Sequence, residues 1–439
     1  MTRIFKVVAL LALALLLLLG LVAFALHRWV STDDFRARME HEATAALGVP
    51  VKLGSIAVDV WPLPAVALGG LTVQTRPAFT LERLEVRPEW HALLLGRLAV
   101  ATLLVHQAVV PQQGVDALML SLQKKKQPAP TGKEASLNWL PRRTVLDDVT
   151  WVSGAGTRTT FDAQAQLGDD GLPDTATITL RKGALQGMQG QLKRESQDDG
   201  SSTGSDKGIE KGNQWRLRID VGGGTVQGQL GTRRVAPARA GQGGHDVVLQ
   251  GQLQTKGVEV AALTAPNKPL SGLLEASTTL SGRAATLSAL ADVLQTHTTF
   301  TVRNATLHGL DLVKAVQTIG LNRGGQTGLD TLAGQVHSQG RAVQLNNLVA
   351  SSGALSANGN VAVSPAKALS GRVTVDLAGG AVGVPLLVGG TLDAPEVTLT
   401  RGALLGAAIG TAIMPGVGTG AGAKLGDRMG EGLGKLFGK

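Results

Sequence analysis

The sequence predicts a mainly β protein, in which an N-terminal transmembrane helix precedes an elongated, curved antiparallel β-sheet, shaped like a half-pipe, with a few short helices and a glycine-rich helical tail. Three observations lead to this fold class. A charge-free apolar run lies near the N-terminus, most of the chain after it alternates apolar and polar residues, and glycines recur at every fourth residue near the C-terminus. An apolar period of two is typical of strands that bury one face.

The apolar run covers Val7–Leu26, with Leu16 near its centre. As a helix it would extend about 30 Å, which is the thickness of the hydrocarbon core of a bilayer. A secretory signal peptide has a shorter apolar core of about 7–15 residues before a small-x-small cleavage site. Ala23-Phe24-Ala25 offers such a site, so a cleaved signal is the alternative to an uncleaved anchor. Arg3 and Lys6 favour a cytoplasmic N-terminus, and we expect the bulk of the chain on the far side of the membrane.

Composition excludes several function classes. The chain has no cysteine, so it has no disulfide framework, no thiolate metal site and no cysteine nucleophile. The net charge of +9 suggests nucleic-acid binding, but the basic residues are scattered and only 3% of residues are aromatic, so we predict no nucleic-acid partner. The one basic cluster, Lys124–Lys126, is predicted to lie in a solvated loop, with attraction to anionic lipid headgroups as the alternative.

One amphipathic helix follows the anchor, over Asp33–Leu47. Ser31 and Asp34 have the spacing of a capping box, and Gly48 followed by Pro50 ends the helix. Beyond it the apolar period changes from 3.6 to 2.

Alternation is clearest in Trp215–Val221 and recurs in Val373–Leu377 and in several other runs separated by Gly, Asn or Pro. Such spacing predicts an antiparallel β-meander with one apolar face. The residues that we expect on this face, as lining of an apolar groove, are Trp215, Leu217, Ile219, Val221, Val373, Val375 and Leu377.

Helical interruptions are few, and we predict short helices between strands at Leu287–Gln295 and Leu310–Ile319. Two polar stretches, Gln123–Asn138 and Arg194–Gln214, are predicted to be flexible loops. We do not place domain boundaries there, because the strand pattern resumes unchanged on either side.

The C-terminal region breaks the β pattern. Its glycines lie along helical stripes of a predicted glycine zipper, which consists of Gly402, Gly406, Gly410, Gly422, Gly426 and Gly430. Glycines at this period let another helix approach closely. A packed helical hairpin, a membrane-associated segment and a loosely ordered tail are the alternatives for this region.

We find no catalytic signature and no motif for a metal or cofactor. His41-Glu42 begins like a zinc-protease helix, but Ala45 stands where the second histidine is needed. Asp169-Asp170-Gly171 lacks the ligand spacing of a calcium loop and is predicted to form a hairpin turn. The remaining histidines are isolated in the sequence and typical of surface or strand positions; among them are His91, His106, His245, His297, His308 and His337. We therefore predict a protein that is not an enzyme.

Two parts of the chain contain motifs that resemble a known family. Leu47–Val110 combines a short helix, a β unit with Pro62-Leu63-Pro64, and leucines before Gly-Arg-Leu. From Leu270 onward the chain reads LSGLLEASTTLSGR, FTVRNATLHGLDLVKAV and VPLLVGGTLDAPEVTL in that order. Both parts resemble the AsmA family, whose closing elements match Val384-Pro385-Leu386 and Gly390–Pro395.

The resemblance implies a single-pass protein of the Gram-negative inner membrane with its body in the periplasm, linked to outer-membrane assembly and lipid homeostasis. Larger relatives form grooves that conduct lipids between membranes. We expect five segments: 1–30 the anchor, 31–110 the AsmA-like N-terminal unit, 111–269 a central β-meander, 270–400 the AsmA-like C-terminal β region, and 401–439 the tail.

An apolar sheet face must be covered, either by protein, as in an ordinary core, or by lipid. Burying one acyl CH₂ contributes roughly 0.8 kcal/mol, so a chain of about 14 carbons could gain on the order of 10 kcal/mol. The expected partners are thus membrane lipids, phospholipid in particular, and outer-membrane or periplasmic assembly proteins. The alternative function is a scaffold that binds outer-membrane proteins through exposed strand edges without carrying lipid.

Overall fold

The computed structural model describes residues 32–59, 65–89, 99–125, 141–154, 156–195, 213–235, 246–265, 268–284, 290, 293–317, 324–340, 342–378, 383–392, 394–400 and 402–403. The predicted anchor with Val7, Leu16 and Leu26 lies outside these residues, as do Gly406, Gly410, Gly422, Gly426 and Gly430 of the predicted glycine zipper. Among the helices within the described ranges, none has the length and apolar character needed to cross a bilayer.

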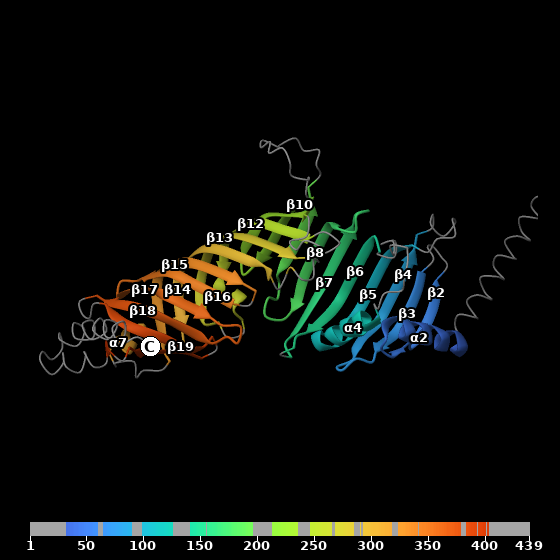
Figure 1. The fold of residues 1–439 in the computed structure, drawn as a ribbon, viewed down its shortest axis with the longest axis horizontal. Helices are drawn as coiled ribbons and strands as arrows, with labels where there is room; N and C mark the ends of the chain where they lie inside the picture. Colours follow the sequence, from blue (N-terminus) through green and yellow to red (C-terminus); the bar gives the residue numbers. More distant parts are fainter. Residues whose placement is uncertain are drawn as a thin grey trace, which may run out of the picture. The chain divides into compact units, whose positions relative to one another are not determined.

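The chain divides into two compact units, residues 1–191 and residues 192–439. Both are mainly β, with an open and largely antiparallel sheet and few helices, as the sequence predicts (Figure 1). The division falls inside the segment 111–269 that the sequence treats as one meander.

Unit 1 contains two helices and the first strands of the chain. These elements are α2 (Asp33–Leu47), β1 (Val51–Lys52), β2 (Ser55–Asp59), β3 (Ala65–Val73), β4 (Phe79–Pro88), β5 (Val100–Pro111), α4 (Gln112–Lys125), β6 (Arg143–Val152), β7 (Arg158–Leu167) and β8 (Pro173–Lys182), and β9 (Gln189–Arg194) spans the boundary to unit 2. β1 and β2 both pair with β3, and β3 to β8 then pair in chain order.

Helix α2 has the bounds that the sequence predicts and protects the edge of this sheet. Its N-cap is Thr32, one residue after the predicted Ser31, and the Thr32 hydroxyl accepts from the Phe35 N–H. Gly48 ends the helix in the left-handed conformation, as predicted. The Glu40 carboxylate accepts a hydrogen bond from the Leu53 N–H at 2.7 Å, so the helix satisfies a backbone donor between the edge strands β1 and β2.

The connection from β5 to β6 differs from the predicted meander. These two strands are parallel, and parallel neighbours require a crossover connection, often through a helix. Helix α4 begins this crossover and includes Lys124 and Lys125, so the prediction of a loop from Gln123 is wrong at that end. Residues 126–138 of that predicted loop lie outside the described residues.

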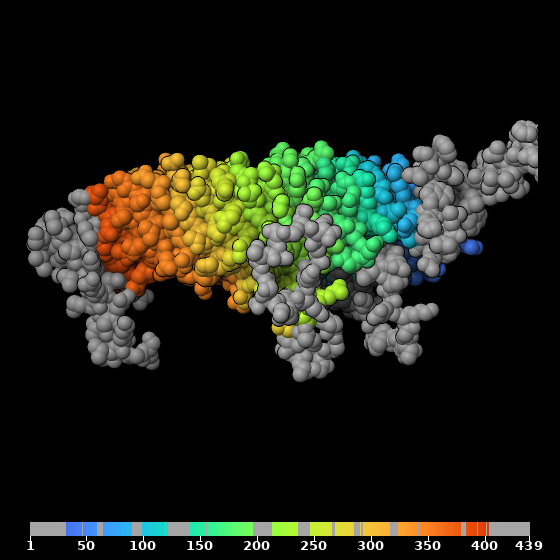
Figure 2. All heavy atoms as spheres, turned by 90° about the horizontal axis from the view of Figure 1, so that it is seen from above, coloured from blue at the N-terminus to red at the C-terminus, as the bar shows by residue number. Residues whose placement is uncertain are grey.

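Unit 2 is an antiparallel meander in chain order. Its elements are β10 (Asn213–Val221), β11 (Gly224–Val235), β12 (Asp246–Glu259), α5 (Val260–Leu263), β13 (Leu270–Ala284), β14 (Gln295–His308), α7 (Leu312–Gln317), β15 (Gln326–Gln339), β16 (Ala342–Ser351), β17 (Leu355–Val363), β18 (Leu369–Leu377), β19 (Val384–Thr391) and β20 (Ala394–Leu399). In the space-filling view, the colours of unit 2 change in chain order from yellow-green to red, as expected when each strand lies beside its sequence neighbours (Figure 2).

The short helices agree in part with the prediction. Helix α7 lies within the predicted range Leu310–Ile319. Of the predicted helix Leu287–Gln295, the described residues Leu290 and Val293 are helical, whereas Gln295 already begins β14. The polar stretch Arg194–Gln214 separates β9 from β10, and its residues 196–212 lie outside the described part of the chain.

β-Bulges keep apolar side chains on one face of the sheet at places where strict alternation would direct some of them to the other face. In β16 the register shifts between Leu345 and Leu348, and Asn347 there has a positive φ of 51°. The extra residue lets both leucines face the core side, and the Asn347 N–H is accepted by the Asn360 side-chain oxygen at 2.8 Å. In β6 the same arrangement recurs at Asp148. Asparagine and aspartate tolerate this conformation better than other side chains.

The main core of unit 2 lies between α7 and the sheet. Leu312, Ala315 and Val316 of α7 are buried against β15 and β18. The buried hydroxyl of Thr327 accepts from the Leu312 N–H at 2.9 Å and donates to the Leu310 carbonyl at 2.8 Å. One side chain therefore satisfies two backbone groups that the start of the short helix leaves buried.

We predict that Thr327→Val destabilises unit 2 by about 1–3 kcal/mol, because a donor and an acceptor would be left buried without partners. Thr327→Ser keeps the hydroxyl and should retain most of the stability. Hydrogen-exchange mass spectrometry of peptides from α7 and β15 measures both. The control is Thr299→Val, at an exposed position of β14; an equal loss of protection in this control would contradict the assignment.

Candidate functional site

The apolar side chains of unit 2 lie on one face of the sheet from β10 to β20. On one cross-strand row the neighbours are Ile219, Val226, Thr255, Ala276, Phe300 and Gly334. Beyond the bulge in β16 the row continues through Leu348, Gly359, Val373, Leu386 and Leu399. The predicted single apolar face is thus present in this unit.

Part of this face is closed by protein. A buried core extends over β14 to β20 with α5 and α7, and its members Leu386, Val302 and Val375 are almost fully inaccessible. Val373, Val375 and Leu377 belong to this core or pack against it. Val375 is thus part of a closed core, and Val373 and Leu377 are half-buried beside it.

The other part of the face is not closed in this way. Over β10 to β13 a set of aliphatic side chains on this face is half-buried and belongs to none of the core clusters of the described residues. We call this set the apolar patch; it consists of Leu217, Ile219, Val226, Leu230, Leu249, Leu253 and Leu280. The predicted groove residues Leu217 and Ile219 lie in it.

Glycines form part of the floor of the apolar patch. Gly251 lies between Leu230 and Leu280 in the cross-strand register. A Cβ atom at Gly251 would stand only 2.6 Å from the Leu230 Cδ2 atom and 3.2 Å from the Leu280 Cδ1 atom. The tips of the two leucines thus occupy the space that a larger residue at position 251 would fill. The side chains of the patch are all aliphatic, without an aromatic ring.

The other two predicted groove residues mark the ends of the patch on β10. Trp215 is buried, and the Arg194 guanidinium lies 5.5 Å from the centroid of its ring, a geometry that favours a cation–π contact. Val221 is buried next to the turn whose Gly222 carbonyl accepts from the Glu259 N–H at 2.9 Å. The structure therefore brings all four β10 residues to one face but leaves only Leu217 and Ile219 half-open.

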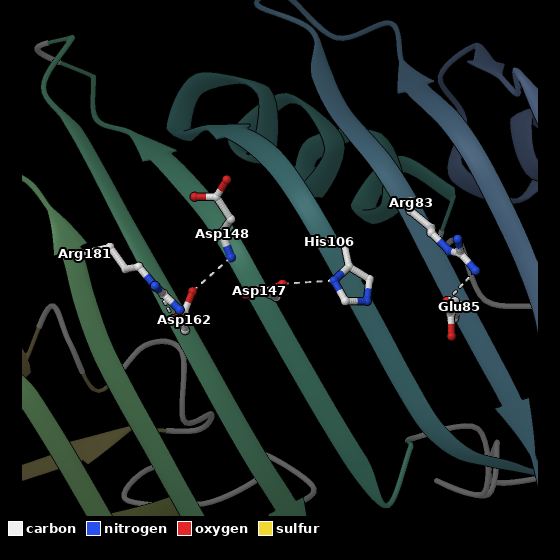
Figure 3. A network of polar contacts seen from close by, with 7 residues as sticks. All are labelled: Arg83, Glu85, His106, Asp147, Asp148, Asp162 and Arg181. Carbon is white, nitrogen blue, oxygen red and sulfur yellow. Dashed lines mark hydrogen bonds and ion pairs between the residues drawn. The ribbon is translucent and has the colours of Figure 1, made fainter.

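Unit 1 has the same two-sided construction. Leu81, Val105, Ala108 and Val149 form a buried cluster on one face. The opposite face carries a chain of polar contacts across β4 to β8, in which the charged side chains point away from the helices (Figure 3). This network consists of Arg83, Glu85, His106, Asp147, Asp148, Asp162 and Arg181.

The contacts of this network are largely exposed. His106 Nδ1 lies 3.1 Å from Asp147 Oδ2, and the Asp148 N–H donates to Asp162 at 3.0 Å. A hydrogen bond from Arg181 to the Asp162 carboxylate, with the charge of that carboxylate, raises the pKa of Arg181. Exposed ion pairs contribute little to stability, so we interpret this face as a solvated surface.

Of the histidines that are isolated in the sequence, His106, His297, His308 and His337 each have a side-chain partner in the fold. His308 Nε2 lies 3.0 Å from the Ser271 hydroxyl, and His297 lies directly against His337 with ring centroids 4.3 Å apart. Sequence reasoning missed the His297–His337 pair because only the β14–β15 register brings these residues together. His91 and His245 lie outside the described residues, and His41 is exposed on α2.

Two further motifs have the expected simple structure. Asp169-Asp170-Gly171 forms the turn between the antiparallel strands β7 and β8, as predicted, and the Asp170 carboxylate accepts from the Leu172 N–H at 3.0 Å. Gly402 and Ala403 are helical, with Ala403 buried in the main core. No group of three or more histidine, cysteine or acidic side chains suited to a metal occurs among the residues that the structure describes.

Comparison of the chain with known protein families, with characterised proteins and with solved structures finds no match.

We predict different costs for two leucine truncations on the same sheet face. Leu386→Ala removes a fully buried side chain from the core and should destabilise unit 2 by about 2–5 kcal/mol. Leu253→Ala removes a half-buried side chain from the apolar patch and should cost about 1 kcal/mol. Denaturant-dependent hydrogen exchange of unit 2 measures both, and equal costs would contradict the distinction between core and patch.

Proposed function

We propose that the apolar patch of unit 2 holds acyl chains of membrane lipids. The observation that carries this proposal is the row of half-buried aliphatic side chains over β10 to β13 that no core cluster includes. Apolar surface of this kind on a folded domain is a common mark of a binding surface. An aliphatic surface suits flexible acyl chains, which need no directional contacts.

The energetics suit transfer better than tight binding. Each acyl CH₂ that moves from water onto the patch gains roughly 0.8 kcal/mol. In a bilayer the same groups are already buried, so exchange between bilayer and protein is nearly balanced. A protein that hands lipid onward requires this near-balance, because a strongly bound lipid would not leave.

The wider proposal combines this patch with the N-terminal sequence. Val7–Leu26 would anchor the chain in the inner membrane of a Gram-negative cell, with both units in the periplasm. The protein would then act as a non-enzymatic, AsmA-like factor that supports outer-membrane assembly and lipid homeostasis. In this view the strands form an elongated, curved half-pipe, with phospholipid as the expected cargo.

A second candidate function rests on the end of the sheet in unit 2. Among the described residues, β20 pairs only with β19, so its other edge has no strand partner in the described part of the chain. Such an edge can bind an extended segment of another protein by β-augmentation. A scaffold that binds outer-membrane or periplasmic proteins in this way would need no lipid.

We predict that a carboxylate in the apolar patch removes bound lipid. Leu253→Glu and Ile219→Glu each place a charge where acyl chains would lie, which is unfavourable unless the charge is solvated. The full-length protein would be extracted in a detergent-free polymer, purified, and its co-purified lipid quantified by mass spectrometry. The N-terminal segment alone retains some annular lipid, which serves as the baseline. We expect each patch variant to lose most of the lipid that the wild-type protein holds above this baseline.

The matched control is Gln252→Glu, which adds the same charge one residue away on the exposed face of β12. It should leave bound lipid unchanged. Normal circular dichroism of all three variants excludes unfolding as the cause. If lipid stays with the patch variants but a protein partner is lost on substitution at the β20 edge, the scaffold function replaces lipid holding.

A further inference from the structure

The polar face of unit 2 brings two histidines together in one cross-strand row. Thr279 of β13 pairs with His297 of β14, His297 pairs with His337 of β15, and His337 pairs with Gln344 of β16. His297 Nδ1 lies 3.2 Å from His337 Nδ1 and 3.1 Å from His337 Nε2. All four side chains are exposed, on the side of the sheet opposite the apolar patch.

A pocket of about 320 Å³ lies at this row. Its lining consists of Thr279, Ser281, Gln295, Thr296, His297, His337, Ser338, Gln339, Ala342 and Gln344. Apart from the two histidines, none of these lining residues can ionise. The pocket therefore offers imidazole nitrogens, amide oxygens and hydroxyls, without a carboxylate that would favour Ca²⁺ or Mg²⁺.

The spacing of the ring nitrogens is close to that of two ligands of one metal ion. Histidine nitrogens bind zinc at about 2.0–2.1 Å, so two of them on a tetrahedral ion stand about 3.3–3.4 Å apart. The observed separations of 3.1 and 3.2 Å are close to this value. Paired strands hold the two Cα positions fixed, so little conformational entropy would be lost on binding.

We propose that His297 and His337 together bind a divalent late transition-metal ion, with water and the Gln344 side-chain oxygen as the further ligands. Imidazole ligands suit Cu²⁺ and Zn²⁺, and Cu²⁺ should bind more tightly. The proposal is independent of the lipid function, since it concerns the other face of the strands.

The test is a Cu²⁺ and Zn²⁺ titration of the full-length protein, purified without a histidine tag. We expect His297→Gln and His337→Gln each to weaken the binding of both ions by about tenfold or more, since each removes one of two imidazole ligands. Glutamine keeps a polar side chain of similar length at each exposed strand position. The control is His41→Gln, which removes an exposed histidine on α2 and should leave the affinity unchanged.

Electron paramagnetic resonance of the Cu²⁺ complex provides a second readout. The wild-type spectrum should show coupling to two imidazole nitrogens, and each single variant should show one. A variant that carries both His297→Gln and His337→Gln should bind the ions far more weakly than wild type. Wild-type affinity in this double variant, or an equal loss of affinity in His41→Gln, would overturn the proposal. Circular dichroism and thermal melting in the absence of metal separate loss of a ligand from loss of the fold.

Discussion

The structure of unit 2 depends on keeping apolar side chains on one face of the sheet through eleven successive strands. Period-two alternation achieves this within a strand, but strands as long as β13 or β14 also contain irregular positions. Bulges at such positions insert one residue and return the next apolar side chain to the same face. With the bulge at Asn347, Leu348 faces the core and Val349 is exposed on the polar face. Without it, Leu348 would be directed to the polar face instead.

Closure of this face, and not its sequence pattern, separates core from patch. Val373 and Val375 have the same alternation as Leu217 and Ile219, yet only Val373 and Val375 lie in or against the core cluster that includes residues of α7 and β19. The covering elements come from other parts of the chain, so their effect is not visible in the strand itself. A half-covered aliphatic surface is unfavourable in water, which is the physical reason for assigning it a ligand.

Much of the fold follows from local patterns. The α2 bounds, the α7 region and the apolar face of β10 are predictable, because caps and periodicity determine them locally. The parallel pairing of β5 with β6 is not, since it depends on a crossover connection and not on the residues of the two strands. The His297–His337 contact is equally hidden, because a shift of one residue in the β14–β15 register would separate the rings.

The alternation that builds the sheet also lets one set of strands carry two independent surfaces. Thr279 and Leu280 are neighbours in the chain, yet one lies in the histidine row and the other in the apolar patch. A substitution on one face changes the chemistry of that face while the backbone hydrogen bonds that define the strand remain. An open sheet of this kind can therefore hold an apolar ligand on one side and a polar or metal ligand on the other, without either site requiring a separate domain. This follows from the fact that successive side chains of a strand point to opposite faces, and β13 is the strand that contributes to both surfaces.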